Sequence, residues 1–264
     1  MNSITTEKLS IAYEEHVIVR DLHMQIPENK ITAIIGPNGC GKSTVLKALS
    51  RILRPKGGMV YLNGSDINKL STKEVAKKMA ILPQTPQAPS GLTVGELVAY
   101  GRFPHQKGLG KLSQNDKKII EWALEVTSLS ELEITAVDNL SGGQRQRVWI
   151  AMALAQQTDL ILLDEPTTYL DLAYQLEVLE LLHKLNREQK CTIAMVLHDL
   201  NLAARFADYM IAIRYGGIIA HGEPDKIMTA EVLRETFGIE AEITKESRTG
   251  RPTCISYNLL KRKI

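Results

Sequence analysis

Two stretches of this sequence carry residues suited to holding phosphate. The first, Gly36-Pro-Asn-Gly-Cys-Gly-Lys-Ser43, fits the pattern G-x-x-x-x-G-K-[ST] and follows an apolar run, Ile31–Ile35. In such a loop the glycines let backbone N–H groups approach phosphate oxygens, and the following helix directs its positive end at the same anion. Lys42 supplies a charge for the β- and γ-phosphates, and the Ser43 hydroxyl is a ligand for Mg²⁺. The predicted nucleotide-binding residues of this loop are Gly36, Pro37, Asn38, Gly39, Cys40, Gly41, Lys42, Ser43 and Thr44.

A pair of carboxylates far down the chain fits the same chemistry. Asp164 ends the apolar run Leu160-Ile-Leu-Leu-Asp164 and is followed by Glu165. A carboxylate at the end of a parallel strand emerges at the ligand-binding edge of the sheet, so we expect Asp164 to hold Mg²⁺. Glu165 is predicted to orient or deprotonate a water that attacks the γ-phosphate. The alternative is a pair of solvated carboxylates ahead of Pro166, which the upstream loop disfavours.

The second phosphate-holding stretch is Ser141-Gly-Gly-Gln144, ahead of the helix-forming segment Arg145–Ala155. The serine and the glycine N–H groups predict another anion cradle at a helix N-terminus. The alternative is a serine that only caps the helix, with flexible glycines after it. A single ATP can face one loop and one cradle. If the cradle lies remote from its own loop, closure requires two chains arranged head to tail around each ATP.

Cys40 lies inside the first loop, near a helix N-terminus and Lys42, and both features lower the pKa of a thiol. We therefore expect Cys40 to react with a maleimide, to be protected by ATP, and to be dispensable for hydrolysis. The other cysteines, Cys191 and Cys254, show no metal or redox spacing, and a reducing cytoplasm fits best.

Composition bounds the class of protein. At 264 residues, with 44% hydrophobic and 23% charged residues, the chain suits one large globular α/β domain, with or without an inserted subdomain. A net charge of +2 provides no strongly basic surface, so nucleic acid is not expected as a partner. The longest purely apolar stretch, Val148–Ala155, is shorter than the ~20 residues that span a bilayer.

The hydrophobic pattern predicts the strands and helices around these residues. Apolar runs that alternate or are β-branched predict strands, and apolar residues at three- and four-residue spacing predict helices. The expected strands are Ser3–Ala12, Val17–Ile26 and Met59–Leu62 in an antiparallel group, a buried strand Ile31–Ile35, and strands Leu160–Leu163 and Ile193–Leu197. The expected helices are Ser43–Leu53, Val94–Tyr100, Asp116–Thr127 and one that carries Leu172, Leu176, Leu179 and Leu182; a terminal hairpin is expected from Ile239–Thr244 and Thr253–Tyr257.

The segments Pro83–Gly91 and Gly101–Gly110 are rich in proline and glycine, which indicates loops and a change of composition relative to the preceding residues. We predict an α/β fold with a nucleotide-binding core, an antiparallel β subdomain and an inserted α-helical subdomain. The whole chain is expected to form a single domain, with the core at about 1–84 and 141–238, the helical insertion at about 85–140, and a C-terminal hairpin and tail at about 239–264.

Taken together, the loop, Leu140–Gln144 and Leu160–Glu165 resemble, in order and spacing, the ATP-binding subunits of ABC transporters, over essentially the whole chain. The resemblance implies roles for residues that are weak signals by themselves. Gln84 resembles the glutamine that senses Mg²⁺ and water and faces the membrane partner, and His198 resembles the switch histidine that contacts the γ-phosphate. Tyr13 resembles the aromatic residue that stacks on adenine, and Asp171 resembles the aspartate that communicates across the dimer.

The resemblance also assigns the site residues to different roles. The implied catalytic residues are Glu165 and His198; the implied Mg²⁺ ligands are Ser43, Gln84 and Asp164; and the residues that bind the ATP of the partner subunit are Ser141, Gly142, Gly143 and Gln144. One departure is Tyr169, which stands where many members of the family have a small residue.

Within the family, Tyr100-Gly-Arg-Phe-Pro-His105, Thr167-Thr-Tyr-Leu-Asp171 and Leu140–Trp149 resemble the ATPase subunits of iron–siderophore, haem and cobalamin importers. The similarity is greatest to ferric hydroxamate or catecholate importers of Gram-positive bacteria. It implies a homodimer on the cytoplasmic face of the membrane, bound to transmembrane permease subunits and indirectly to a siderophore-binding lipoprotein.

Two alternatives keep a place beside this interpretation. One is the ATPase of a haem or cobalamin importer. The other is an ABC ATPase that handles DNA or ribosomes. An ABC ATPase that handles DNA would need a long coiled coil in the insertion, and the predicted helix Asp116–Thr127 is too short and lacks heptads. A translation-associated protein would carry two cassettes, and this chain carries one.

Overall fold

The computed structural model describes residues 2–106 and 111–260. The chain forms two compact units: one runs to Leu70 and resumes at Thr192, and the other runs from Ser71 to Cys191. Residues 107–110, in the predicted insertion, and 261–264, in the predicted C-terminal segment, lie outside the described residues. Among the described residues, no helix combines the length and the apolar content needed to cross a membrane.

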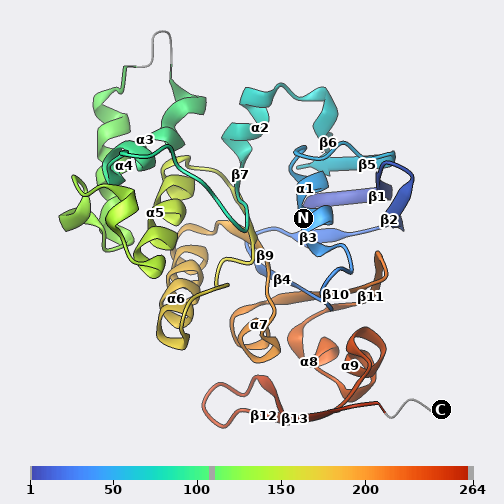
Figure 1. Cartoon of the computed structure of the whole chain (residues 1–264). Helices are drawn as coiled ribbons and strands as arrows, with labels where there is room; N and C mark the ends of the chain where they lie inside the picture. Colours follow the sequence, from blue (N-terminus) through green and yellow to red (C-terminus); the bar gives the residue numbers. More distant parts are fainter. Residues whose placement is uncertain (1, 107–110, 261–264) are drawn as a thin grey trace. The chain divides into compact units, whose positions relative to one another are not determined.

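The first unit consists of strands from both ends of the chain, with short helices between them (Figure 1). Its strands are β1 (Asn2–Tyr13), β2 (His16–Leu22), β3 (Gln25–Pro27), β4 (Ile31–Ile35), β5 (Gly57–Leu62), β6 (Ser65–Asp66), β9 (Thr192–Val196), β10 (Tyr209–Arg214), β11 (Gly217–Gly222), β12 (Ile239–Lys245) and β13 (Pro252–Leu259). Its helices are α1 (Lys42–Leu49), η1 (Ile67–Lys69), α7 (Leu200–Phe206), α8 (Pro224–Ile227) and α9 (Ala230–Phe237).

The strand β4 is the centre of this unit. All five of its residues are buried, as are all five of β9, which fits strands covered on both faces. β4 pairs in parallel with β10 on one side and with β9 on the other, and β11 pairs antiparallel with β10. The predicted buried strand Ile31–Ile35 and the predicted strand Ile193–Leu197 are confirmed, and the second begins and ends one residue earlier than expected. The chain segments that follow β4 and β9 therefore leave from the same edge.

A second sheet in this unit is antiparallel, with the order β2-β1-β5-β6 and with β3 also paired to β1. The predicted single strand Val17–Ile26 is wrong, because two strands, β2 and β3, occupy that range. The break is held by Thr6, whose hydroxyl donates to the carbonyl oxygen of Leu22 and accepts from the N–H of Met24, both at 2.9 Å. The break therefore depends on a residue far away in the sequence.

The helix after the phosphate loop also differs from expectation. It ends at Leu49 rather than at Leu53. Arg51 has a left-handed φ of 63°, which a helix cannot contain, and its Nη1 donates to the carbonyl oxygens of Ile67 and Leu70 at 3.2 and 2.8 Å. These contacts draw the chain away from the helix axis toward η1.

The predicted terminal hairpin is confirmed as β12 and β13, which pair antiparallel along their length. In Figure 1 the hairpin lies beside α7 and α9, and contacts join β13 to α7 and β12 to α9. Asn201 of α7 holds the hairpin through both amide atoms: its Oδ1 accepts from the N–H of Cys254 at 2.8 Å, and its Nδ2 donates to the carbonyl oxygen at 3.1 Å.

The second unit is mainly helical around a pair of parallel strands, β7 (Met79–Leu82) and β8 (Leu160–Asp164). Its helices are α2 (Thr72–Lys78), α3 (Val94–Ala99), η2 (Tyr100–His105), α4 (Gln114–Val126), η3 (Ser130–Leu132), η4 (Val137–Asn139), α5 (Gly142–Ala155) and α6 (Leu172–Gln189). The predicted strand at Leu160–Leu163 is confirmed with one more residue, and both predicted helices of the insertion are present.

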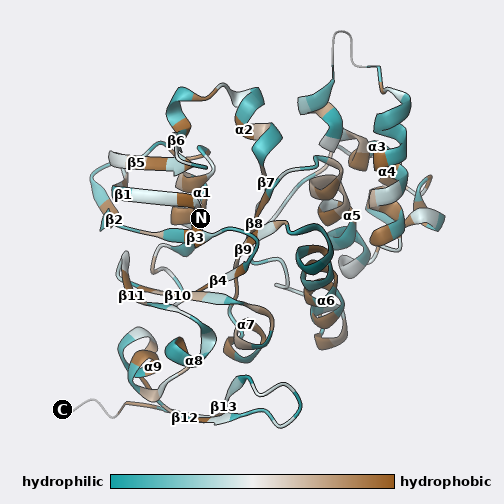
Figure 2. Cartoon of the chain, turned by 180° about the vertical axis from the view of Figure 1, so that it is seen from behind, coloured by the Kyte–Doolittle hydropathy of each residue, from teal (hydrophilic) through white to brown (hydrophobic). Residues whose placement is uncertain are grey.

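The helix α6 is amphipathic, and Figure 2 shows hydrophobic and hydrophilic residues mixed along it. Its buried apolar stripe begins at Val178 and continues through Leu179, Leu182 and Leu185. The expected stripe began earlier. The predicted helix is confirmed as α6, and its first leucine, Leu172, is 66% exposed.

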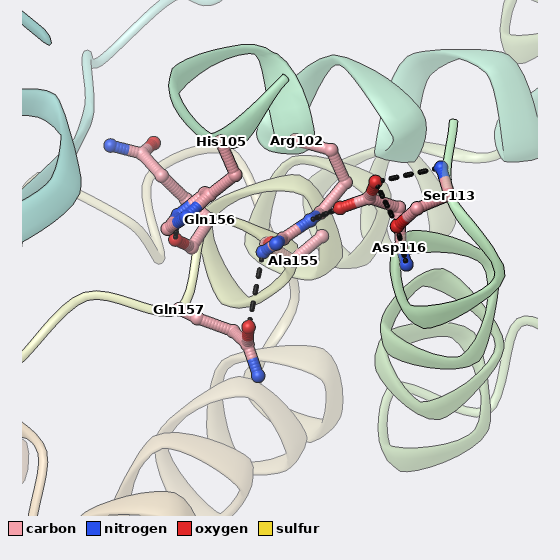
Figure 3. Close-up of polar contacts among 7 residues, drawn as sticks. All are labelled: Arg102, His105, Ser113, Asp116, Ala155, Gln156 and Gln157. Carbon is pink, nitrogen blue, oxygen red and sulfur yellow. Dashed lines mark hydrogen bonds and ion pairs between the residues drawn. The ribbon is translucent and has the colours of Figure 1, made fainter. Parts of the chain in front are cut away.

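Two residues of the Tyr100–His105 run, Arg102 and His105, hold the helical unit together (Figure 3). Arg102 is 3% exposed; its Nε donates to Asp116 of α4 at 2.8 Å, and its Nη1 donates to the carbonyl oxygen of Ala155 at 2.7 Å. His105 Nε2 lies 2.8 Å from the carbonyl oxygen of Gln156. Arg102 and His105 therefore fasten η2 to the end of α5, and Arg102 fastens it to the start of α4.

Asp116 is held from two sides. Hydrogen bonds from Ser113, and then from Arg102, lower the pKa of the Asp116 carboxyl from 3.8 to about 2, although burial opposes the shift. Since the folded pKa lies below the ordinary value, the ionised carboxylate stabilises the fold above pH 3.8. That contribution is lost as the pH falls from 3.8 to about 2.

Removing Arg102 should therefore destabilise the protein strongly. We expect Arg102→Leu to lower the free energy of unfolding by about 3–5 kcal/mol, because it leaves a buried carboxylate without its charged partner. Urea unfolding at pH 7 measures the change. The control is Lys184→Leu, which breaks an exposed ion pair with Glu188 and should cost about 1 kcal/mol or less. Equal losses in the two variants would contradict the importance of the buried pair.

Candidate nucleotide site

The phosphate loop begins where β4 ends. Gly36 has a φ of 155°, and a Cβ atom at this position would lie 2.1 Å from the carbonyl oxygen of Ile213 on β10. Any other residue would collide with the neighbouring strand. Glycine is therefore required here for the chain to leave the sheet and turn into the loop.

The loop ends at the start of α1. Gly41 is the N-cap, with a left-handed φ of 105°, and no side chain caps the helix. Val45 N–H donates to the Gly41 carbonyl oxygen at 2.8 Å, so the first intrahelical bond starts here. The N–H groups of the first turn have no intrahelical acceptor, and the helix dipole makes this end positive. The arrangement is suited to an anion.

Lys42, at the first position of α1, turns back over the loop. It is 5% exposed, and its Nζ donates to the carbonyl oxygens of Gly36 and Pro37, both at 2.9 Å. Because a buried ammonium requires oxygen partners, these carbonyls hold the charge at the loop itself. The charge thus lies beside the backbone that is expected to carry phosphate.

Cys40 differs from expectation. The residue is 6% exposed, and burial raises the pKa of its thiol, with the charge of Lys42 acting in the opposite direction. The predicted lowering of the pKa is wrong because desolvation outweighs the attraction to Lys42. The backbone of Cys40 is held as well, since the N–H of Gly216 donates to its carbonyl oxygen at 3.1 Å.

His198 lies at the same sheet edge as the loop. It follows Leu197, whose N–H donates to the carbonyl oxygen of Ile34 on the neighbouring β4 at 3.2 Å, and it is exposed. The next residue, Asp199, caps α7 by accepting from Leu202 N–H at 2.8 Å. Tyr13 ends β1 and is 45% exposed, opposite His16 in the β1–β2 hairpin.

In the second unit, the structure brings Gln84 and Glu165 together. Leu82 at the end of β7 pairs with Leu163 of β8, so the residues that follow leave from one edge. Gln84 Nε2 donates to Glu165 Oε2 at 2.6 Å. Asp164, the last residue of β8, is 4% exposed. Sequence reasoning placed each residue near phosphate, and it did not foresee this direct hydrogen bond.

Glu165 is also strained. Its φ is 53°, a left-handed conformation that costs about 1–3 kcal/mol in a residue other than glycine. Thr168, which lies in the Thr167–Asp171 run but was given no role of its own, donates its hydroxyl to the same oxygen, Glu165 Oε2, at 3.0 Å. The signal that could have found it is its position three residues after the glutamate in a turn.

The Ser141–Gln144 segment begins α5. Ser141 Oγ accepts from Gln144 N–H at 3.3 Å, and Gln144 Oε1 accepts from Ser141 N–H at 3.0 Å, which forms a capping box. Ser141 therefore does cap the helix, as the alternative interpretation held. The cap does not remove the positive charge of the helix dipole at this end. Gly143 has a packing reason, since a Cβ there would lie 2.9 Å from the ring of Tyr174. Asp171 caps α6 by accepting from Tyr174 N–H at 3.1 Å.

The three predicted metal ligands carry oxygen donors of the kind that Mg²⁺ prefers. Among the described residues, no group of three or more His, Cys, Asp or Glu side chains could hold a metal ion. Ser43, Gln84 and Asp164 offer hydroxyl, amide and carboxylate oxygens. Mg²⁺ prefers oxygen ligands and is commonly bound by one or two carboxylates together with substrate phosphates.

The chain is similar to known proteins in sequence and in structure. A family model described as ABC transporter matches residues 19–168. The iron(3+)-hydroxamate import ATP-binding protein FhuC of Bacillus subtilis (strain 168) is 61% identical over 99% of this chain and 97% of its own length. The petrobactin import ATP-binding protein FpuD of Bacillus anthracis is 48% identical over 97% and 93%. The solved dimeric structure of MJ0796, a bacterial ABC transporter cassette, matches with a TM-score of 0.74 and 30% identity, covering 83% of this chain and 98% of that one.

The burial of Cys40 leads to a testable order of thiol reactivity. We expect N-ethylmaleimide at pH 7 to modify Cys254 first, because Cys254 is the least buried of the three thiols. Cys40 and Cys191 should react slowly, since burial raises both pKa values, that of Cys191 to about 12. Peptide mapping by mass spectrometry over time measures the order, with a urea-denatured sample as the control. Fastest modification at Cys40 would restore the original expectation of a reactive loop thiol.

Proposed function

The chain belongs to the ABC transporter ATP-binding family, and on that premise we propose that it energises the import of a ferric siderophore across the cytoplasmic membrane. It is an ATPase, converting ATP and water to ADP and phosphate. The observation that carries the cargo assignment is the 61% identity, over 99% of this chain, to an iron(3+)-hydroxamate import protein. A second relative, at 48% identity, imports petrobactin by its name.

In the first unit, the proposed work is binding the nucleotide. The phosphate loop supplies backbone N–H groups and the positive end of α1, and Lys42 supplies a charge held beside them. Tyr13, half exposed at the end of β1, offers a ring face for the adenine. His198 leaves the sheet from the strand beside β4, which supports a role at the γ-phosphate.

In the second unit, the proposed work is preparing water to attack the γ-phosphate. Glu165 would orient or deprotonate that water, and its hydrogen bond with Gln84 supports a shared task. Asp164 and Gln84 of this unit, together with Ser43 of the first unit, are proposed ligands of Mg²⁺, which would neutralise phosphate charge when bound. Asp164, buried at the end of β8, has its position fixed by the strand.

The proposed working form is a homodimer. Each chain has one phosphate loop and one Ser141–Gln144 cradle, so a head-to-tail pair of chains could place each ATP between a loop and a cradle. The dimeric structure of the MJ0796 cassette supports this form. ATP then favours the closed pair because only that state supplies the second set of N–H donors. Asp171, which caps α6, would communicate between the two chains.

Import requires partners in the membrane. The family to which the chain belongs works with permease subunits. We infer that this chain lies at the cytoplasmic membrane face and binds permease subunits near residues 84–106. A separate siderophore-binding lipoprotein would deliver the cargo to the permease. Nucleic acid is not among the proposed partners.

The first test separates the roles of Glu165 and Ser141. Glu165→Gln should lower ATP hydrolysis by about 100-fold or more while ATP binding persists, because it removes the proposed base. The variant should then accumulate as an ATP-bound dimer. Adding Ser141→Arg should abolish that dimer, because a long charged side chain fills the cradle. Asp164→Asn should instead weaken Mg²⁺-dependent binding. Size-exclusion chromatography with light scattering, in ATP and in ADP, measures the dimer.

If the isolated Glu165→Gln chain shows no dimer, the measurement is repeated with the permease present. A Glu165→Gln complex that hydrolyses ATP at the wild-type rate would remove Glu165 from the proposed catalytic role.

The second test concerns cargo. Deleting the gene should impair growth on at least one ferric siderophore as the sole iron source, with haem, cobalamin and manganese uptake less affected. Uptake of radiolabelled ferric hydroxamates and catecholates measures the defect, and a plasmid-borne copy is the control. Normal uptake of every siderophore, together with loss of haem or cobalamin uptake, would reject the siderophore assignment. The protein would still be the ATPase of an importer, with a different cargo.

A further inference from the structure

Thr168, in the turn after β8, makes contacts with Glu165 that no role described so far explains. Thr168 Oγ1 donates to Glu165 Oε2 at 3.0 Å, and Thr168 N–H donates to the Glu165 carbonyl oxygen at 3.2 Å. Thr168 thus contacts Glu165 through both its side chain and its backbone. We propose that Thr168 is a positioning residue that fixes the Glu165 carboxylate for the attack of water on ATP. This inference rests on the proposed catalytic role of Glu165.

The carboxylate is held by two donors from different segments. Gln84, after β7, donates to the same oxygen at 2.6 Å, and Thr168 approaches from the turn after β8. One donor leaves a carboxylate free to pivot about that bond, whereas two donors on one oxygen restrict its orientation. Bonds to a charged acceptor are stronger than neutral ones, which makes the restriction effective. Thr168 therefore supplies the second constraint.

The backbone of the turn supports the same role. Glu165 and Tyr169 both have left-handed φ angles, 53° and 65°, and Leu170 N–H donates to the Thr167 carbonyl oxygen at 3.3 Å. Thr167, between the two, is 9% exposed. A turn that bears strain at its first residue needs contacts that maintain it. The hydroxyl of Thr168 reaches Glu165 because this turn brings residues three apart together.

The choice of threonine also has a physical reason. A β-branched side chain has few accessible χ1 rotamers, so its hydroxyl points in a limited set of directions. Valine keeps that shape and lacks the hydroxyl. Serine keeps the hydroxyl and lacks the branch. The two substitutions therefore separate hydrogen bonding from packing.

The chain offers a matched control at another turn. Thr249 Oγ1 donates to Glu246 Oε2 at 2.6 Å, with the same spacing of three residues, between β12 and β13. Thr249→Val removes the same kind of bond from an exposed turn of the other unit. It should leave the rate of ATP hydrolysis unchanged.

The experiment measures kcat and KM for ATP in the assembled transporter. Thr168→Val should lower kcat by about 10- to 100-fold, since displacement of a catalytic group by about 1 Å has effects of this size. KM should change little, because the proposed role acts on Glu165 rather than on bound ATP. Thr168→Ser should recover most of the lost rate. If Thr168→Val does not fold, as judged by thermal unfolding, Thr168→Ala and Thr168→Ser are compared in its place.

The outcomes separate this inference from the proposed function. Wild-type kcat in Thr168→Val, beside an inactive Glu165→Gln, would overturn the positioning role and leave the catalytic role of Glu165 intact. An active Glu165→Gln would instead overturn the proposed role of Glu165, on which this inference rests. Equal losses in Thr168→Ser and Thr168→Val would overturn it too, because packing rather than the hydroxyl would then be responsible.

Discussion

The phosphate loop depends on the burial of one strand, β4. Its five residues are covered completely between β10 and β9, so the strand cannot move without breaking both pairings. Gly36 leaves that strand against the carbonyl oxygen of Ile213, and the loop is held again where Gly216 N–H donates to Cys40. A loop of backbone N–H groups can bind an anion only if its dipoles are already oriented. The hydrophobic strand provides that orientation.

The backbone is strained at Glu165, directly after β8, where the chain positions a carboxylate. Asp164 is fixed as the last residue of the buried strand, whereas Glu165 departs in a left-handed conformation. The two adjacent carboxylates therefore differ in surroundings, one enclosed by the strand and the other held by Gln84 and Thr168. Adjacent residues with different fixed environments can serve different steps, which is the division of labour proposed for metal binding and water activation.

Local patterns predicted most of the strands and the motif positions, because burial on both faces leaves a continuous apolar run and phosphate loops need glycine at set spacing; β10 and β11 were not among the predicted strands. What local patterns could not supply were effects of distant residues. The break between β2 and β3 depends on Thr6, and the early end of α1 depends on contacts of Arg51 with η1. The pKa of Cys40 was misjudged because its burial comes from tertiary packing rather than from the loop sequence. The link between Gln84 and Glu165 joins residues 81 positions apart.

In the proposed dimer, each ATP site takes its phosphate loop from one chain and its Ser141 cradle from the other. Mixing two inactive variants tests it most directly: Lys42→Ala lacks the loop charge, and Ser141→Arg blocks the cradle. Each alone should be inactive in the transporter, because both sites of a pure dimer are damaged. An equimolar mixture should recover about a quarter of the wild-type hydrolysis rate, since half of the dimers are mixed and each has one intact site. Formation of mixed dimers without any recovered hydrolysis would contradict the shared site.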